Sequence, residues 1–176
     1  KPEAVFSFFA GGGAVKFVKD YAAAGLKKNI QLYGTGFLTD GTREAQGEAA
    51  VSQTVEELGS VDILVNNAGT LDHLGQLVDQ SPELWERDLR VNLTGAFNCS
   101  RAVWPHMKER GWGRIVNMAS VAGTLGGFGQ ASYSTTKAGL IGLTKTLALE
   151  GARHGITANA IVPGIIGTEA FDFGNP

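Results

Sequence analysis

The sequence 131-ASYSTTKAGLIGLTKTLALEGARHG-155 is followed at once by the short apolar run 156-ITANAIV-162. In the first segment, leucines recur at three and four positions (Leu140, Leu143 and Leu147), which is the spacing of one face of a helix. The second segment has the length and apolar content of a buried strand. These residues therefore predict a long helix that leads directly into a strand.

Four similar apolar runs come earlier in the chain, at 4–10, 30–36, 61–65 and 114–118. Helical patterns lie between and after them, near 13–25, 43–58, 83–110 and 131–153. Alternating strands and helices predict an α/β fold with a three-layer, doubly wound parallel sheet, covered on both faces. Only one β-α-β unit precedes the crossover into 61–65, so right-handed connections give the Rossmann-like or flavodoxin-like strand order 2-1-3-4-5. We expect five strands in a single domain, 1–176.

Composition narrows the possible partners. The chain has 176 residues, of which 43% are hydrophobic and 18% charged, and its formal net charge is -2. It can bury a substantial core and has no basic excess, so we expect no nucleic-acid partner. No apolar run approaches about 20 residues and the start carries no signal-peptide pattern, so we expect no membrane association.

Cysteine and histidine usage adds two further expectations. The single cysteine, Cys99, lies among apolar helix residues and suits a small core position, in keeping with a reducing, cytoplasmic location. The histidines His73, His106 and His154 are scattered without the spacing of a ligand set, so we expect no metal.

The long helix carries two residues with chemical potential. Tyr133 and Lys137 lie one turn apart on one face. A phenol is a poor acid or base at neutral pH unless a nearby cation stabilises its anion, and Lys137 can be that cation. The spacing alone is weak evidence, because chance produces it often.

Further motifs surround this pair: 66-NNAG-69, 91-VNLTGAF-97, 118-MAS-120 and 163-PGIIGT-168. In order and spacing they resemble the short-chain dehydrogenase/reductase family from about Thr42 to about Thr168. The resemblance implies a catalytic set of Asn92, Ser120, Tyr133 and Lys137. It also implies an oxidoreductase that uses NAD or NADP and acts on a small-molecule carbonyl or alcohol substrate.

Each catalytic residue would have a distinct role by this resemblance. Tyr133 is the general acid/base, and Lys137 supports it and binds the nicotinamide ribose. Ser120 holds the substrate oxygen, and Asn92 completes a water-linked proton path. Other readings stay open from the residues alone: Asn92 as a solvated helical residue, Ser120 as a loop hydroxyl or helix cap, and Asn66 as a turn residue.

The expected cofactor site lies at the carboxyl ends of the strands, where ligands bind in sheets of this kind. The residues that we expect there, besides Tyr133 and Lys137, are Gly11, Gly12, Gly13, Asp40, Asn66, Ala68, Gly69, Pro163, Gly164, Ile166 and Thr168.

Two parts of the chain depart from the family pattern. The first loop, 10-AGGGAVKFVKDY-21, lacks the spaced glycines that approach a pyrophosphate. Residues 1–41 resemble instead a β-α-β piece of the periplasmic branched-chain amino-acid-binding proteins. After Thr168, little remains of a substrate-covering segment. These departures predict an engineered chimera of two fragments with weak or no activity, and leave a non-catalytic scaffold as the alternative.

Assembly is the last expectation. Members of the family pair through the helices that match 83–110 and 131–153. Phe97, Trp104, Leu143 and Leu147 would give these helices an apolar outer face. We therefore expect a homodimer, with pairing through the edge strand 156–162 as the second possibility.

Overall fold

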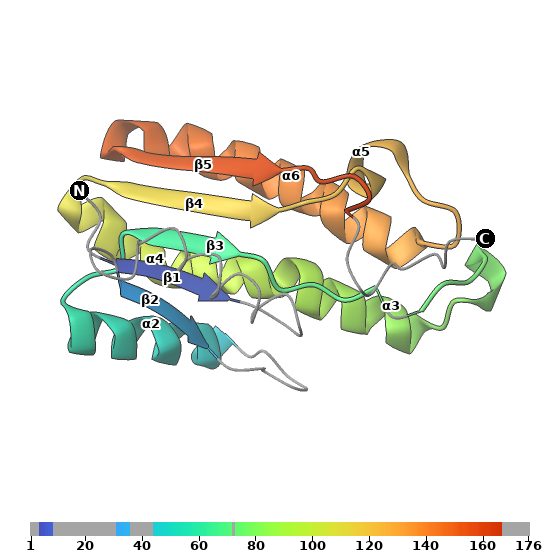
Figure 1. Cartoon of the computed structure of the whole chain (residues 1–176), viewed down its shortest axis with the longest axis horizontal. Helices are drawn as coiled ribbons and strands as arrows, with labels where there is room; N and C mark the ends of the chain where they lie inside the picture. The colour runs from blue at the N-terminus through green and yellow to red at the C-terminus, as the bar shows by residue number, and fades with distance from the viewer. Residues whose placement is uncertain (1–3, 9–30, 36–43, 72, 167–176) are drawn as a thin grey trace.

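A computed structural model describes residues 4–8, 31–35, 44–71 and 73–166. Five strands form one parallel sheet: β1 (Ala4–Phe8), β2 (Gln31–Thr35), β3 (Ile63–Asn66), β4 (Gly113–Met118) and β5 (Ile156–Ile161). Their order is β2-β1-β3-β4-β5, as expected from the single unit before the crossover (Figure 1). The Rossmann-like α/β class predicted from the sequence is confirmed.

The helices come close to the predicted ranges. They are α2 (Glu44–Leu58), α3 (Pro82–Asp88), α4 (Gly95–Arg110), the one-turn α5 (Ala122–Leu125) and α6 (Ala131–Gly151). Short 3₁₀ turns lie at Leu77–Asp79 and Ala152–His154. The stretch predicted as one helix, 83–110, is instead α3 and α4 joined by a π-helical turn, Leu89–Thr94. None of the helices in the described ranges is long and apolar enough to cross a bilayer.

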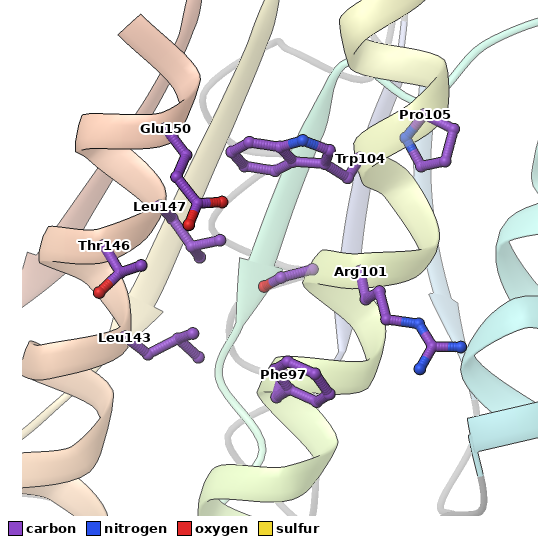
Figure 2. A pocket seen from close by; sticks show the side chains of 9 residues that line it. Phe97, Arg101, Trp104, Pro105, Leu143, Thr146, Leu147 and Glu150 are labelled. Atoms are coloured by element: carbon purple, nitrogen blue, oxygen red, sulfur yellow. The ribbon is translucent and has the colours of Figure 1, made fainter.

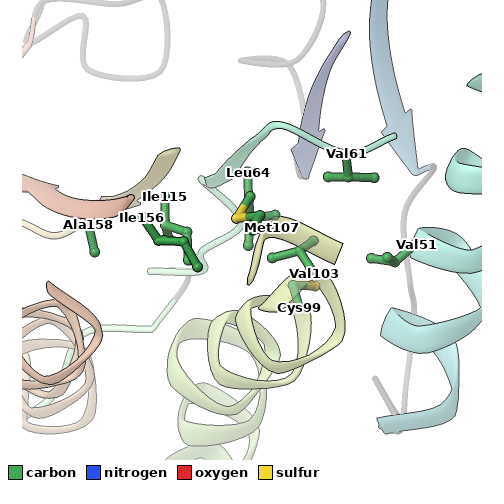
Figure 3. Packing of buried hydrophobic residues seen from close by; sticks show 9 residues of the cluster. All are labelled: Val51, Val61, Leu64, Cys99, Val103, Met107, Ile115, Ile156 and Ala158. Carbon is green, nitrogen blue, oxygen red and sulfur yellow. The ribbon is translucent and has the colours of Figure 1, made fainter. Parts of the chain in front are cut away.

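One hydrophobic core joins the sheet to α2, α4 and α6. Val51 of α2 and Met107 of α4 are fully buried with Leu64, Ile115 and Ile156 of the strands (Figure 3). Cys99 belongs to this cluster, as its apolar neighbours predicted. Burying a side chain of this size contributes about 1.5–3 kcal/mol, so this layer stabilises much of the described structure.

The three described helices that build this core lie on the same face of the sheet (Figure 3). On the other face, alternate residues of β5 such as Thr157 and Asn159 are exposed. The helical stretch predicted near 13–25 lies outside the described residues. The second helical layer therefore stays a prediction.

The outer surface of α4 and α6 carries an open groove of about 360 Å³ (Figure 2). Phe97 and Trp104 line it from α4, and Leu143 and Leu147 line it from α6. Phe97 is 46% exposed. Trp104 and Leu147 are less exposed, because they also pack against the core. Of the four side chains expected on the apolar outer face, Phe97 is exposed, and Trp104, Leu143 and Leu147 are partly buried.

Two glycines of α6 should respond oppositely to alanine. A Cβ on Gly142 would meet open space, whereas a Cβ on Gly151 would lie 2.7 Å from the backbone oxygen of Ile156. We expect Gly142→Ala to raise the free energy of unfolding by about 1 kcal/mol, because alanine is the better helix former. Gly151→Ala should lower it. Urea denaturation checks both, and equal effects would contradict this packing.

Candidate functional site

The site is built at the carboxyl ends of β3 and β4. Asn66 and Asn117 are register partners, and β5 runs alongside, with Met118 opposite Ile161. The pairing continues into the loops: the amide of Ala119 donates to Ile161, and that of Val121 donates to the Pro163 carbonyl. The loops that follow β4 and β5 are thereby held together, and the loop after β3 leaves the same edge of the sheet (Figure 1).

Lys137 is the cation of this edge. Its side chain is almost fully buried, and Nζ donates a 2.7 Å hydrogen bond to the carbonyl of Met118, the last residue of β4. Nζ lies 5.4 Å from the centre of the Tyr133 ring, one turn earlier on α6. The helix therefore brings the ammonium beside the phenol, as the four-residue spacing predicted.

Burial has an electrostatic consequence for this lysine. Loss of hydration lowers the pKa of Lys137 to about 8. Desolvation penalises the charged form, so the folded protein releases a proton that the unfolded chain retains up to about pH 10.5. At neutral pH most of the ammonium remains protonated and keeps its positive charge near Tyr133.

Asn92 is placed by the π-helical turn and is 1% exposed. Its amide pairs twice with the backbone of Thr70: Oδ1 accepts from the Thr70 amide at 2.7 Å, and Nδ2 donates to the Thr70 carbonyl at 3.1 Å. Nδ2 also lies 3.4 Å from the hydroxyl of Thr136 on α6. A solvated helical asparagine is excluded, because this side chain fastens the loop after β3.

Gly69 lies next to both Lys137 and Asn92. A Cβ there would lie 3.1 Å from Lys137 Nζ and 3.5 Å from Asn92 Oδ1. Only a glycine leaves this space open without displacing the ammonium. The exposed Gly69 thus lies beside both the Lys137 ammonium and the Asn92 amide.

Ser120 follows β4 by two residues. Its hydroxyl oxygen accepts a 3.2 Å hydrogen bond from the amide of Ala122, which begins α5. This bond ties Ser120 to the start of α5, whose N-cap residue is Val121, and it does not use the hydroxyl proton. A hydroxyl that accepts one bond can still donate its own proton to a ligand.

Asn66, one of the expected cofactor residues, has its side chain turned into the protein. Its side chain is 5% exposed, and Nδ2 donates to Asn117 Oδ1 at 2.8 Å and to Ser100 Oγ at 3.1 Å. Asn117 in turn donates to Thr144 on α6. These buried bonds join two strands to α4 and α6, so the Asn66 side chain supports the site from behind.

The other expected cofactor residues divide into two groups. Ala68, Gly69, Pro163, Gly164 and Ile166 lie in the loops at the carboxyl edge, with Ala68 packed partly against the core and Ile166 exposed. Gly11, Gly12, Gly13, Asp40 and Thr168 lie outside the described residues. Within the part of the chain that the structure describes, no cluster of three metal-ligating side chains occurs.

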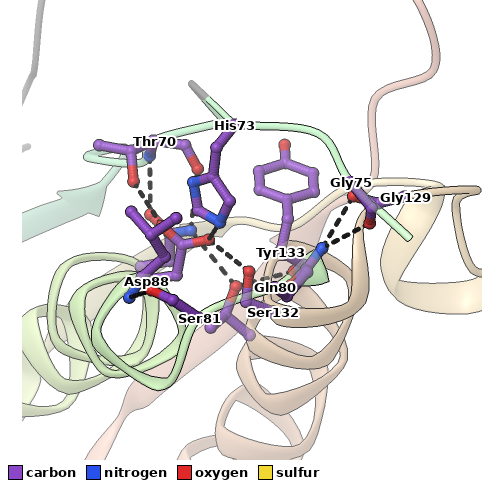
Figure 4. A network of polar contacts seen from close by, with 12 residues as sticks. Thr70, His73, Gly75, Gln80, Ser81, Asp88, Gly129, Ser132 and Tyr133 are labelled. Atoms are coloured by element: carbon purple, nitrogen blue, oxygen red, sulfur yellow. Dashed lines mark hydrogen bonds and ion pairs between the residues drawn. The ribbon is translucent and has the colours of Figure 1, made fainter. Parts of the chain in front are cut away.

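Sequence reasoning missed a second polar network beside Tyr133 (Figure 4). Asp88 is fully buried, and its carboxylate accepts hydrogen bonds from Thr70 and Ser132. Gln80 donates to the carbonyls of Gly75 and Gly129 at 3.0 Å each. A usable signal existed for Asp88: it lies four residues before Asn92, on the same face of an otherwise apolar helical pattern.

Comparison with known proteins places this site in a family. The pattern of the family described as short chain dehydrogenase matches residues 7–174, and the chain belongs to this family. The match includes most of the segment 1–41 that the sequence assigned to a binding protein. The predicted second ancestry and the chimera therefore find no support.

Several curated relatives are similar over much of the chain. Acetoacetyl-CoA reductase of Rhizobium meliloti is 50% identical over 119 residues, which are 68% of this chain and 49% of the relative. A subunit of (2S)-[(R)-hydroxy(phenyl)methyl]succinyl-CoA dehydrogenase of Thauera aromatica is 41% identical over 170 residues, 93% of this chain and 68% of the relative. The chain spans about half the length of most of the curated relatives that it matches.

A solved structure is similar to this chain in its fold. The crystal structure of NAD⁺-bound xylitol dehydrogenase superposes with a TM-score of 0.81 and 30% identity, covering 96% of this chain and 72% of that protein.

The buried ammonium leads to a pH prediction. Because the folded protein holds fewer protons than the unfolded chain above pH 8, the contribution of Lys137 to the free energy of unfolding should rise between about pH 8 and 10.5. The total gain should be about 3 kcal/mol, at about 1.4 kcal/mol per pH unit. The stability difference between the wild type and Lys137→Met, measured by denaturation across this range, should grow accordingly. A constant difference would contradict the desolvated lysine.

Proposed function

We propose that the chain is an NAD(P)-dependent oxidoreductase that interconverts a carbonyl and an alcohol. The observation that carries this proposal is the burial of Lys137 beside Tyr133, with Nζ 5.4 Å from the centre of the ring and with Asn92 also next to Gly69. Family membership and the NAD⁺-bound structural relative support the cofactor.

Each residue then has a defined task. The cofactor supplies or accepts a hydride at the reacting carbon. In the reducing direction the Tyr133 hydroxyl gives its proton to the carbonyl oxygen, and the Lys137 ammonium stabilises the phenolate that remains. Ser120 donates a hydrogen bond to the same substrate oxygen. Asn92 holds the loop that borders this space.

The relatives indicate a substrate class. The relatives include proteins named acetoacetyl-CoA reductase, 3-oxoacyl-[acyl-carrier-protein] reductase and (2S)-[(R)-hydroxy(phenyl)methyl]succinyl-CoA dehydrogenase subunit, and these names indicate thioester substrates. We therefore propose a 3-oxoacyl thioester, reduced at its keto carbon to the 3-hydroxyacyl thioester. The exposed Leu125 and Phe128, between Ser120 and Tyr133, provide apolar surface for an acyl chain.

The test is turnover of acetoacetyl-CoA with NADPH or NADH. We expect Tyr133→Phe to lower kcat by about 1,000-fold or more, because the proton donor is removed while the ring and the cofactor loops remain. Cofactor should still raise the melting temperature of the variant as much as that of the wild type. Loss of absorbance at 340 nm and a thermal shift assay measure the two effects.

The same two measurements address the alternative of a non-catalytic scaffold. Ligand at a thousand times its Kd stabilises a protein by about 4 kcal/mol, whereas ligand well below its Kd gives almost nothing. No thermal shift and no turnover with either cofactor would favour the scaffold. Turnover that survives Tyr133→Phe would refute the proposed proton donor.

We also propose that the chain forms a homodimer through the groove between α4 and α6. The groove is mainly apolar and Phe97 is 46% exposed, so a second copy related by a twofold axis would remove this surface from water; Arg101, at the rim on α4, already pairs with Glu48 (Figure 2). Pairing through β5, the edge of the described sheet, is the second possibility.

A charge in the groove should separate the copies. We expect Phe97→Glu to give a monomer in multi-angle light scattering, because a carboxylate would be buried without a partner. Leu149→Glu is the matched control: this leucine is exposed on α6 but does not line the groove, so the dimer should persist. A wild type that is monomeric at every concentration would rule out both interfaces.

A further inference from the structure

Asp88, the last residue of α3, is fully buried next to the proposed catalytic residues. Its Oδ2 accepts a short 2.5 Å hydrogen bond from Ser132 Oγ, and its Oδ1 accepts a 3.1 Å bond from Thr70 Oγ1 (Figure 4). His73 Nε2 lies 3.6 Å from Oδ2. A carboxylate is costly to bury, so its partners must compensate for the lost hydration.

The cluster contains a serine, a histidine and an aspartate, but its connectivity is not that of a hydrolytic triad. In a triad the histidine accepts the proton of the serine, and the carboxylate orients the histidine. Here the Ser132 hydroxyl donates to the carboxylate itself, and His73 approaches the same oxygen. The serine is thereby held as a donor, and the cluster does not generate a nucleophile.

The partners of Asp88 are instead the neighbours of the site. Ser132 precedes Tyr133 in the sequence. Thr70 follows Gly69, and its backbone amide and carbonyl are both hydrogen-bonded to the Asn92 side chain. These hydrogen bonds form a closed ring, which we call the circuit. Asp88 bonds Thr70, Thr70 bonds Asn92, and Asn92 bonds Thr136. The first turn of α6 links Thr136 to Ser132, which bonds Asp88. Figure 4 shows the Tyr133 ring projecting from α6 towards the loop that carries Thr70 and His73.

We propose that Asp88 is a positioning residue for the reaction: through Ser132 and Thr70 it sets where the Tyr133 hydroxyl stands relative to Lys137 and the loop after β3. The short charge-assisted bond to Ser132 is the stronger of the two links and acts directly on the residue before Tyr133. This inference deepens the proposed oxidoreductase function and rests on it.

Asp88→Asn tests the link with little change in shape. An asparagine offers one acceptor oxygen where the carboxylate offers two, so one hydroxyl loses its acceptor and the remaining bond loses its charge. We expect kcat to fall by about tenfold or more, while the Kd of NAD(P)H stays within about twofold. Ser132→Ala should reproduce the fall, and the double variant should be no worse than either single one, because both changes break one link.

A readout independent of turnover is the NMR signal of the Tyr133 ring carbons, assigned by its absence in Tyr133→Phe. Asp88→Asn and Ser132→Ala should both shift this signal. Ser81→Ala is the matched control: Ser81 caps α3 by accepting from the Leu84 amide, so its loss weakens the same helix without touching the circuit. It should lower the melting temperature and leave the Tyr133 signal and kcat unchanged.

Two outcomes would overturn the role of Asp88. One is an unchanged Tyr133 signal in both Asp88→Asn and Ser132→Ala, and the other is a signal that moves equally in Ser81→Ala. If Asp88→Asn does not fold, Ser132→Ala, which keeps the carboxylate, decides the matter. A wild type without turnover would refute the proposed function separately, since the NMR comparison does not depend on activity.

Discussion

The hydrogen bond from Lys137 Nζ to the Met118 carbonyl is the contact on which the site depends. It joins Lys137, in the second turn of α6, to the last residue of β4. The contact therefore holds a helix residue and a strand residue together at one edge of the sheet. The same burial lowers the pKa of the ammonium to about 8. Structural attachment and chemical tuning of this lysine therefore have one cause, its removal from water.

Two polar networks surround this contact at different depths. Behind it, Asn66, Asn117 and Thr144 link β3 and β4 to α6 through buried hydrogen bonds. Beside it, Asp88 and Asn92 hold the loop after β3. An unsatisfied buried polar group costs about 1–3 kcal/mol, so each network favours one arrangement of helices and loops over its alternatives. Rigid surroundings of this kind suit the proposed reaction, which needs Ser120, Tyr133 and Lys137 in fixed relative positions.

The fold and the place of Lys137 beside Tyr133 could be predicted because they rest on local pattern. Strand and helix periodicity gave the element ranges within a few residues, and the four-residue spacing put Tyr133 and Lys137 on one face. The split of 83–110 was not predictable in this way. At its π-helical turn, Asn92 bonds Thr70 and Thr136, and Asp88 just before it bonds Ser132, and these partners are not its sequence neighbours. The likeness of 1–41 to a second family misled for the opposite reason: a short β-α-β pattern is shared by many α/β proteins, and the match over residues 7–174 outweighs it.

By itself, the sequence determined the class of fold, through its periodicity, and the placing of Tyr133 and Lys137 on one face of a helix, through their spacing; Ser120 came from the resemblance to the family. Only the tertiary structure decided that the Asn66 side chain faces inward, that Asn92 bonds the Thr70 backbone, and that Asp88 accepts hydrogen bonds from Thr70 and Ser132. The physical reason is that a polar side chain takes its role from the partners that packing brings to it. Those partners come from other elements, and their distances are not written in the spacing of residues along the chain.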